Sequence, residues 1–215
     1  MNVGAVLARS VKEKRLALQN YISSEIPGFD IKSKATSALW AYLSKFIFWN
    51  KEITTSFTTT LYPVVWVPSF PWHADDDITA IKILAHEYVH LHDRRRLGLA
   101  FNFLYITPQI FSLVALLAPY NFWCILFLVF LLPIPSPGRA WLEFRGYRMT
   151  MAVHYWFYGA PPNQEWILRQ FVSSNYYWMF PLKGYLSRRF NQEFEKIQQN
   201  DLTSELEDVK IVLGL

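Results

Sequence analysis

Two segments near the N-terminus carry apolar residues at helical spacing. Between residues 3 and 22, valine, leucine and isoleucine recur among basic residues, which suits an amphipathic helix packed on the domain or lying on a membrane surface. The segment SKATSALWAYLSKFIFWN, 33 to 50, has the same spacing, and we expect a well-buried helix there. Residues 53 to 67 are instead rich in β-branched and aromatic residues and contain prolines, which favours an edge strand or hairpin.

A long helix is predicted close to residues 76 to 97. Three aspartates at 75 to 77 favour a helix N-terminus because carboxylates satisfy free backbone amides there. The arginines at 94 to 96, followed by Gly98, suit a C-terminus. The segment HEYVH, 86 to 90, therefore lies within a helix of about six turns.

The chain carries no charged residue from 97 to 138. The first part of this run is long enough to span a bilayer core, whereas FWCILFLVFLLPI is short for a span. We predict a hydrophobic helical hairpin with its tip near residues 119 to 121. Arginines on both sides of the run place both ends on the cytoplasmic side by the positive-inside rule. The alternative is a buried helical pair in an unusually apolar soluble or assembly protein.

The rest of the chain is predicted to be helical. Residues 139 to 158 suit one helix, closed by two prolines, and a polar helix is expected around 185 to 200. At 215 residues we expect a single domain, 1 to 215, of mainly α structure with a small β-element. Hydrophobic residues make up 52% of the chain and charged residues 18%, so lipid or a partner is expected to cover part of its surface.

Charge and cysteine content narrow the chemistry. The net charge is +4, but the basic residues form short clusters and no stripe, so nucleic-acid binding is not expected. Cys124 is the only cysteine, which excludes an intrachain disulfide and a cysteine-based metal site. Basic residues interrupt the N-terminal apolar positions, so no cleavable signal peptide is expected.

The segment HEYVH carries the candidate chemistry. On a helix, His86 and His90 lie one above the other on the same face and can both bind one zinc ion. Glu87, one position along, can reach a water beside that ion and act as a general base. The alternative is a helix that carries two ordinary surface histidines.

A catalytic zinc needs a third protein ligand and one open position. Glu143 is the strongest candidate, because the segment WLEFRGYRM has a single acid in a predicted helix that otherwise carries arginines and apolar residues. The alternative is that Glu143 forms an intrahelical ion pair with Arg139 or Arg148. Asp93 is better placed to hydrogen-bond a ligand imidazole as an outer partner. The remaining candidates are His92, which points away, His73, which suits a solvated loop, and His154.

Two residues on the Glu143 face of the predicted helix can serve the reaction. Tyr147 and His154 follow Glu143 by 4 and 11 positions, which returns both to its face. Either can donate a hydrogen bond to the oxyanion of a tetrahedral intermediate. Either can equally be a packed core residue.

The pattern of HEYVH, an uncharged run and Glu143 resembles the gluzincin metallopeptidases, in which a later helix supplies a glutamate. More narrowly, it resembles the integral-membrane branch with the CAAX-processing and stress-induced proteases, over residues 53 to 158; small phage-encoded zincin-like proteins are also similar. That branch has an aspartate after the small residue that follows its glutamate, whereas Gly146 is followed here by Tyr147, and Asp93 can take that role. These proteases are also usually larger.

The resemblance implies a zincin-like fold with an inserted hydrophobic hairpin, a bound Zn²⁺ and peptide-bond hydrolysis. An extended peptide would add as a strand beside the 53 to 67 edge. The catalytic part is expected on the cytoplasmic side of a membrane. The alternative function is a non-catalytic structural or assembly protein of a larger particle, such as a virion, whose apolar hairpin packs against partner subunits.

Overall fold

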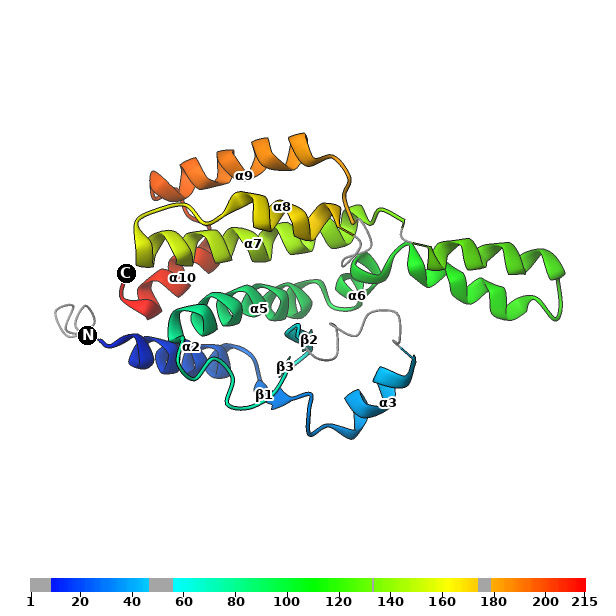
Figure 1. Cartoon of the computed structure of the whole chain (residues 1–215), viewed down its shortest axis with the longest axis horizontal. Helices are drawn as coiled ribbons and strands as arrows, with labels where there is room; N and C mark the ends of the chain where they lie inside the picture. The colour runs from blue at the N-terminus through cyan, green and yellow to red at the C-terminus, as the bar shows by residue number, and fades with distance from the viewer. Residues whose placement is uncertain (1–8, 47–55, 133, 174–178) are drawn as a thin grey trace.

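The computed structural model describes residues 9–46, 56–132, 134–173 and 179–215. The protein is mainly helical with one small sheet, which confirms a mainly α fold with a small β-element (Figure 1). Its helices are α2 (Val11–Glu25), α3 (Ala38–Phe46), α5 (Asp77–Leu97), α6 (Leu99–Ile106), α7 (Pro137–Tyr158), α8 (Gln164–Val172), α9 (Lys183–Gln198) and α10 (Ser204–Leu213), with 3₁₀ helices η1 (Gln109–Leu117) and η2 (Phe122–Leu131).

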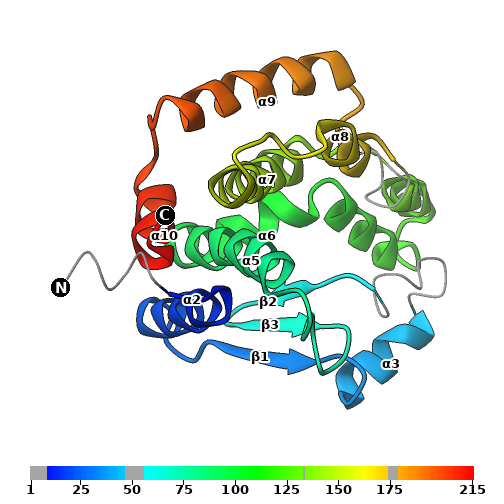
Figure 2. The ribbon, with the colours of Figure 1, turned by 60° about the vertical axis from the view of Figure 1, so that its left-hand side comes forward.

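Helices α5 and α7 lie side by side at the centre of the molecule (Figures 1 and 2). Both have buried apolar residues along their length, among them Leu84 and Leu91 on α5 and Leu142 and Met149 on α7, all with 0% exposure. Helix α2 packs against α5, and α9 packs against α7. This layering buries the α5–α7 pair, which therefore provides a rigid base for a site.

The predicted bounds of the two central helices are confirmed to within about two residues. The Asp76 side chain caps α5 by accepting from the Thr79 amide, and Gly98, with φ of 59°, ends it. Ser136 caps α7 just before Pro137, and Gly159 ends α7 in the left-handed region. Short polar side chains at the N-cap and glycine at the C-terminus are the expected end signals.

The sheet has the order β1 (Asp30–Ser33), β3 (Val64–Val67), β2 (Thr59–Leu61). Strand β1 pairs parallel with β3, and β2 pairs antiparallel with β3, so β2 lies at an edge. Figure 2 shows the sheet alongside α2 and α5, and β2 contacts α5. The predicted edge hairpin is confirmed within the described part of 53 to 67, and residues 53–55 lie outside it.

Two N-terminal expectations change. The first helix runs from Val11 to Glu25, and residues 1–8 of the predicted segment lie outside the described residues. The second helix begins only at Ala38, because β1 and a turn occupy residues 30 to 37, and residues 47–50 lie outside the described part. The expectation that this helix is well buried was wrong: Tyr42 is 60% exposed, and among residues 38 to 45 only Trp40, packed on Trp66, is buried.

The uncharged run forms a hairpin, but its first half is not one helix. Helix α6 ends before Pro108, whose preceding residue Thr107 is extended, and η1 leaves at 87° to α6. The arms η1 and η2 pack on each other and turn between Leu117 and Phe122, at the predicted tip. In Figure 1 this hairpin, drawn in green, extends away from the rest of the molecule.

The hairpin is short and exposed. None of the residues of α6, η1 and η2 is buried, and Leu116 and Trp123 are 74% and 70% exposed. Within the described ranges no single helix has the length and hydropathy to cross a bilayer, although α6 and η1 together meet both criteria as a bent pair. Of the flanking arginines, Arg145 and Arg148 are held in ion pairs inside the helical body.

Candidate metal centre

His86, His90 and Glu143 meet at the contact between α5 and α7. The His86 Nε2 atom lies 3.1 Å from His90 Nε2 and 3.5 Å from Glu143 Oε2, and His90 Nε2 lies 3.7 Å from Glu143 Oε1. His90 and Glu143 are buried, and 12% of the His86 side chain is exposed. These three side chains form a group that could hold a metal ion.

The spacing of the three groups fits a tetrahedral ion. Two ligand atoms that are each about 2.0–2.1 Å from such an ion lie about 3.3 Å apart. The observed separations of 3.1, 3.5 and 3.7 Å bracket this value. An ion held by these three side chains would have one position left for water or substrate, and all three side chains line the cavity described below.

The missing side chain of Gly146 permits the position of the His86 ring. A Cβ at this position of α7 would lie 2.6 Å from His86 Nε2 and 2.7 Å from its Cε1. The opposite ring nitrogen, Nδ1, lies 3.2 Å from Thr150 Oγ1, one turn further along α7. That hydroxyl donates to the Gly146 carbonyl at 3.3 Å, so α7 both makes room for the ring and fixes its orientation.

Glu143 is also held from outside the α5–α7 pair. The Tyr105 hydroxyl of α6 donates to Glu143 Oε1 at 2.7 Å. Burial raises the pKa of Glu143, but the nearby His90 and His86 rings outweigh it, so that the pKa lies well below its ordinary value. Burial lowers the pKa of His90, whereas Glu143 raises it, and the pKa is raised overall. The cluster thus favours positive charge at its centre, as a cation site requires.

The alternative assignment of Glu143, an ion pair with Arg139 or Arg148 along its own helix, is not found among the described residues. Arg139 Nε donates to the Tyr105 carbonyl at 2.8 Å, and its Nη2 donates to Gln109 Oε1 at 3.2 Å. Arg148 pairs with Glu193 on α9 at 3.0 Å. Glu143 therefore faces the histidines.

Glu87 lies beside the cluster without belonging to it. Its Oε2 accepts a hydrogen bond from the Thr60 hydroxyl of β2 at 2.6 Å. Glu87 lines the same cavity as the three candidate ligands. That cavity, of about 690 Å³, is bounded by β2 and the residues before it, α5, α6 and the start of α7. Among the described residues, only Glu87 and Glu143 contribute carboxylates to its lining.

Asp93 occupies a different position from the one expected. It is 1% exposed, and its Oδ2 accepts from Arg145 Nε at 2.9 Å. Within the described ranges, the buried Nδ1 of His90 has no hydrogen-bond partner. His92 also points away from the cluster and lies 3.7 Å from Glu205. Asp93 therefore joins α5 to α7 through an arginine, and the described hydrogen bonds include none from Asp93 to the imidazole of His86 or His90.

The structure separates the two other candidate catalytic residues. The Tyr147 ring packs edge-on against His86, with ring centres 4.8 Å apart, and it also contacts Trp166 and Phe171, so it supports this candidate ligand from the core side. His154 lies beside Tyr158 and outside the cavity lining. Eleven residues advance a helix by about 16 Å, so His154 lies on the same face of α7 as Glu143 but about 16 Å further along the helix axis. His73 is an exposed loop residue.

Four contributors to the site were not anticipated from the sequence: Thr60, Tyr105, Gly146 as the cradle of His86, and Thr150. A glycine inside a helix costs about 0.5–1 kcal/mol relative to alanine, so Gly146 alone carried a usable signal of close packing.

Comparisons with protein-family models, with curated proteins and with solved structures find no match to this chain.

Proposed function

We propose that the protein is a zinc-dependent metallopeptidase with a zincin-like fold, in which His86, His90 and Glu143 bind the ion. The observation that carries this proposal is a second carboxylate, Glu87, in the same cavity but outside the ligand group. Two histidines and one carboxylate are a donor set typical of catalytic zinc. A purely structural zinc site would need four protein ligands, and the described residues offer three.

In this proposal Glu87 and Thr60 have separate roles in hydrolysis. Zinc, when bound, lowers the pKa of water toward about 7 and polarises a carbonyl group. Glu87 takes the proton from the attacking water and passes it to the leaving amine. The Thr60 hydroxyl holds the Glu87 carboxylate by its hydrogen bond to Oε2, which fixes the direction in which the other oxygen points.

The edge strand β2 offers a place for the substrate. Residues 58 to 61 line the cavity that contains the metal cluster. Strand β2 uses one edge to pair with β3. An extended peptide pairs with the other edge, which directs a backbone carbonyl toward the cluster and gives affinity through main-chain hydrogen bonds.

The test separates metal binding from catalysis with three variants. Glu87→Gln keeps the size of the side chain but removes the base, so zinc content should match wild type while cleavage of a mixed peptide library falls by about 10² to 10⁴-fold. His86→Ala should lose both zinc and cleavage. His92→Ala, on the same helix but outside the cluster, should lose neither and serves as the control.

Each outcome decides one part of the proposal. Equal zinc in wild type and His86→Ala, measured by elemental analysis, would rule out the metal site. Equal cleavage by wild type and Glu87→Gln would show that Glu87 is not the base. Zinc binding with no cleavage of the library by wild type favours the alternative, a structural or assembly protein in which the zincin-like fold is retained without turnover.

We propose that the hairpin of η1 and η2 attaches the protein to the cytoplasmic face of a membrane. The support is the exposure of its apolar side chains on both arms. At about 2.0 Å per residue, arms of 9 and 10 residues are about 18 to 20 Å long, short of the roughly 30 Å hydrocarbon core. The hairpin would thus enter one leaflet without crossing. Burial of the same arms against partner subunits is the alternative.

A further inference from the structure

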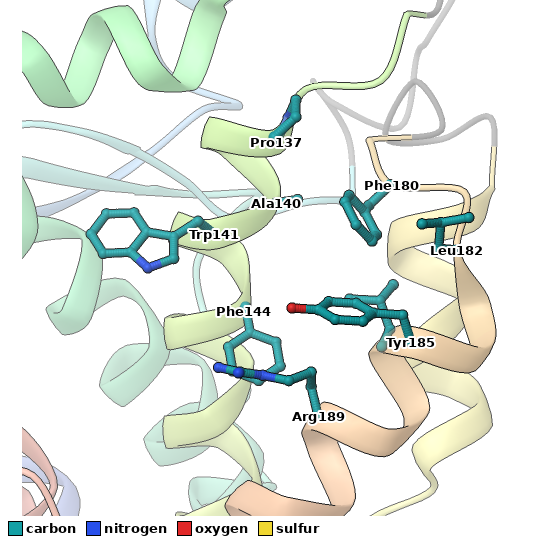
Figure 3. Close-up of a pocket in the computed structure, with 9 residues that line it drawn as sticks. Pro137, Ala140, Trp141, Phe144, Phe180, Leu182, Tyr185 and Arg189 are labelled. Carbon is teal, nitrogen blue, oxygen red and sulfur yellow. The ribbon is translucent and has the colours of Figure 1, made fainter.

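A second cavity lies on the other side of α7, between α7 and α9 (Figure 3). Its volume is about 260 Å³, and none of the candidate metal ligands contributes to it. Among the described residues, the polar groups of its lining are the hydroxyl of Tyr185, the guanidinium of Arg189 and the indole N–H of Trp141. The other lining residues are Pro137, Ala140, Phe144, Phe180, Leu182 and Leu186.

Tyr185 and Arg189 are four residues apart on α9 and therefore lie on the same face of that helix. In Figure 3 the Tyr185 and Arg189 side chains reach from α9 toward Phe144, whereas Pro137 and Phe180 lie at the opposite end of the cavity. The Arg189 guanidinium lies 5.8 Å from the centre of the Phe144 ring. The cavity therefore has one cationic end and one apolar end.

Arg189 has no internal counter-ion among the described residues. No carboxylate of that part of the chain lies within 4.0 Å of it. The acid one turn further along α9, Glu193, is already paired with Arg148 at 3.0 Å and Lys196 at 2.8 Å. Arg189 is exposed, so an anionic group bound to it would keep part of its hydration and would avoid the cost of full burial.

We propose that this cavity binds an anionic amphiphile with a single alkyl chain, of the fatty-acid class. The carboxylate pairs with Arg189 and accepts a hydrogen bond from the Tyr185 hydroxyl, and the alkyl chain lies along the apolar walls toward Pro137. A water molecule in the liquid occupies about 30 Å³. If each carbon of the alkyl chain occupies a similar volume, the cavity of about 260 Å³ holds about nine carbons. The inference does not depend on the metal centre or on peptidase activity.

The test is titration calorimetry of the full-length protein with a series of fatty acids below their micelle concentrations. From hexanoate to decanoate, each added methylene should tighten binding about fourfold, because burial of one methylene gives about 0.8 kcal/mol. Binding should level off by dodecanoate, when the cavity is full. Decanol, which lacks the charge, should bind about two- to fivefold more weakly than decanoate.

Variants locate the bound molecule. Arg189→Gln should weaken decanoate binding about two- to fivefold, whereas Arg188→Gln, an exposed arginine on the same helix outside the cavity lining, should not. Ala140→Leu fills the cavity and should abolish binding, with folding checked by circular dichroism. Absence of saturable binding at every chain length would overturn the proposal. So would equal loss in the two arginine variants, equal binding of decanol, or full binding by folded Ala140→Leu.

Discussion

Replacing Gly146 with alanine tests whether the His86 ring is held where a metal ligand must be. The added Cβ would meet His86 Nε2 at 2.6 Å, and ordinary van der Waals contact begins at 3.4 Å, so the ring must withdraw by the difference of 0.8 Å. Ligand distances in a metal site vary by only about 0.2 Å. His86 should therefore cease to be a ligand, and zinc affinity should fall by more than the 10- to 100-fold typical of losing an outer hydrogen bond.

The fold should tolerate the same substitution. Alanine in a helix interior is favoured over glycine by up to about 1 kcal/mol, and overpacking costs about 1–3 kcal/mol. The free energy of unfolding of the metal-free protein should thus fall by only about 0–2 kcal/mol. Loss of zinc without loss of the fold is the specific result that the geometry predicts.

Gly184→Ala is the matched control. Gly184 lies in the first turn of α9, and a Cβ at that position meets nothing within 4 Å. The control should keep wild-type zinc affinity, measured against a competing chelator, and urea unfolding in chelator should show equal or greater stability. Wild-type zinc affinity in Gly146→Ala would refute the assignment of His86 as a ligand held against α7.

The remaining predictions concern a buried lysine and the hairpin. Burial lowers the pKa of Lys34 to about 8, although Glu87 opposes this, and Lys34 is 3% exposed. The unfolded state therefore binds more protons than the folded state between about pH 8 and 10.5, so stability rises with pH there. Relative to Lys34→Met, wild type should gain about 1–2 kcal/mol of unfolding free energy from pH 7 to 9.5 in denaturant titrations, and a constant difference would contradict the lowered pKa. The protein should sediment with membranes and resist carbonate extraction. Leu116→Asp in the hairpin should weaken membrane binding, whereas Ile211→Asp, at a similarly exposed position on α10, should not. A wild-type protein that stays soluble and monomeric without detergent would contradict membrane attachment.

Local signals in the sequence were sufficient for the central helices. Asp76 and Gly98 mark the ends of α5, and helical spacing places His86 and His90 on one face. The partnership with Glu143 followed from its being an isolated acid in a helix otherwise rich in arginine, and the three are brought together in the structure. Spacing and caps are properties of neighbouring residues, so the sequence reports them directly.

Features that depend on position along a helix or on distant contacts were not predictable in this way. Periodicity shows which face of a helix a residue occupies, but not which part of a neighbouring helix or cavity lies beside it. His154 was therefore grouped with Glu143 although it lies outside the cavity. Asp93 was assigned to a histidine because nothing in the sequence shows that α7 brings Arg145 against it. Tyr105 was hidden within an apolar run whose helical hairpin pattern gave no reason to assign it a polar contact.

The contact made by Tyr105 joins the metal cluster to the base of the hairpin. Helix α6 lies against the start of α7 because Gly138 has no side chain: a Cβ there would lie 2.7 Å from the Leu104 carbonyl oxygen. One residue beyond Leu104, the Tyr105 hydroxyl holds Glu143, while Arg139 binds both the Tyr105 carbonyl and Gln109, the first residue of η1. A candidate ligand and the first arm of the hairpin thus share one short set of hydrogen bonds. Because the same segment positions Glu143, we expect that binding of lipid or protein at the hairpin would alter the geometry of the candidate metal centre.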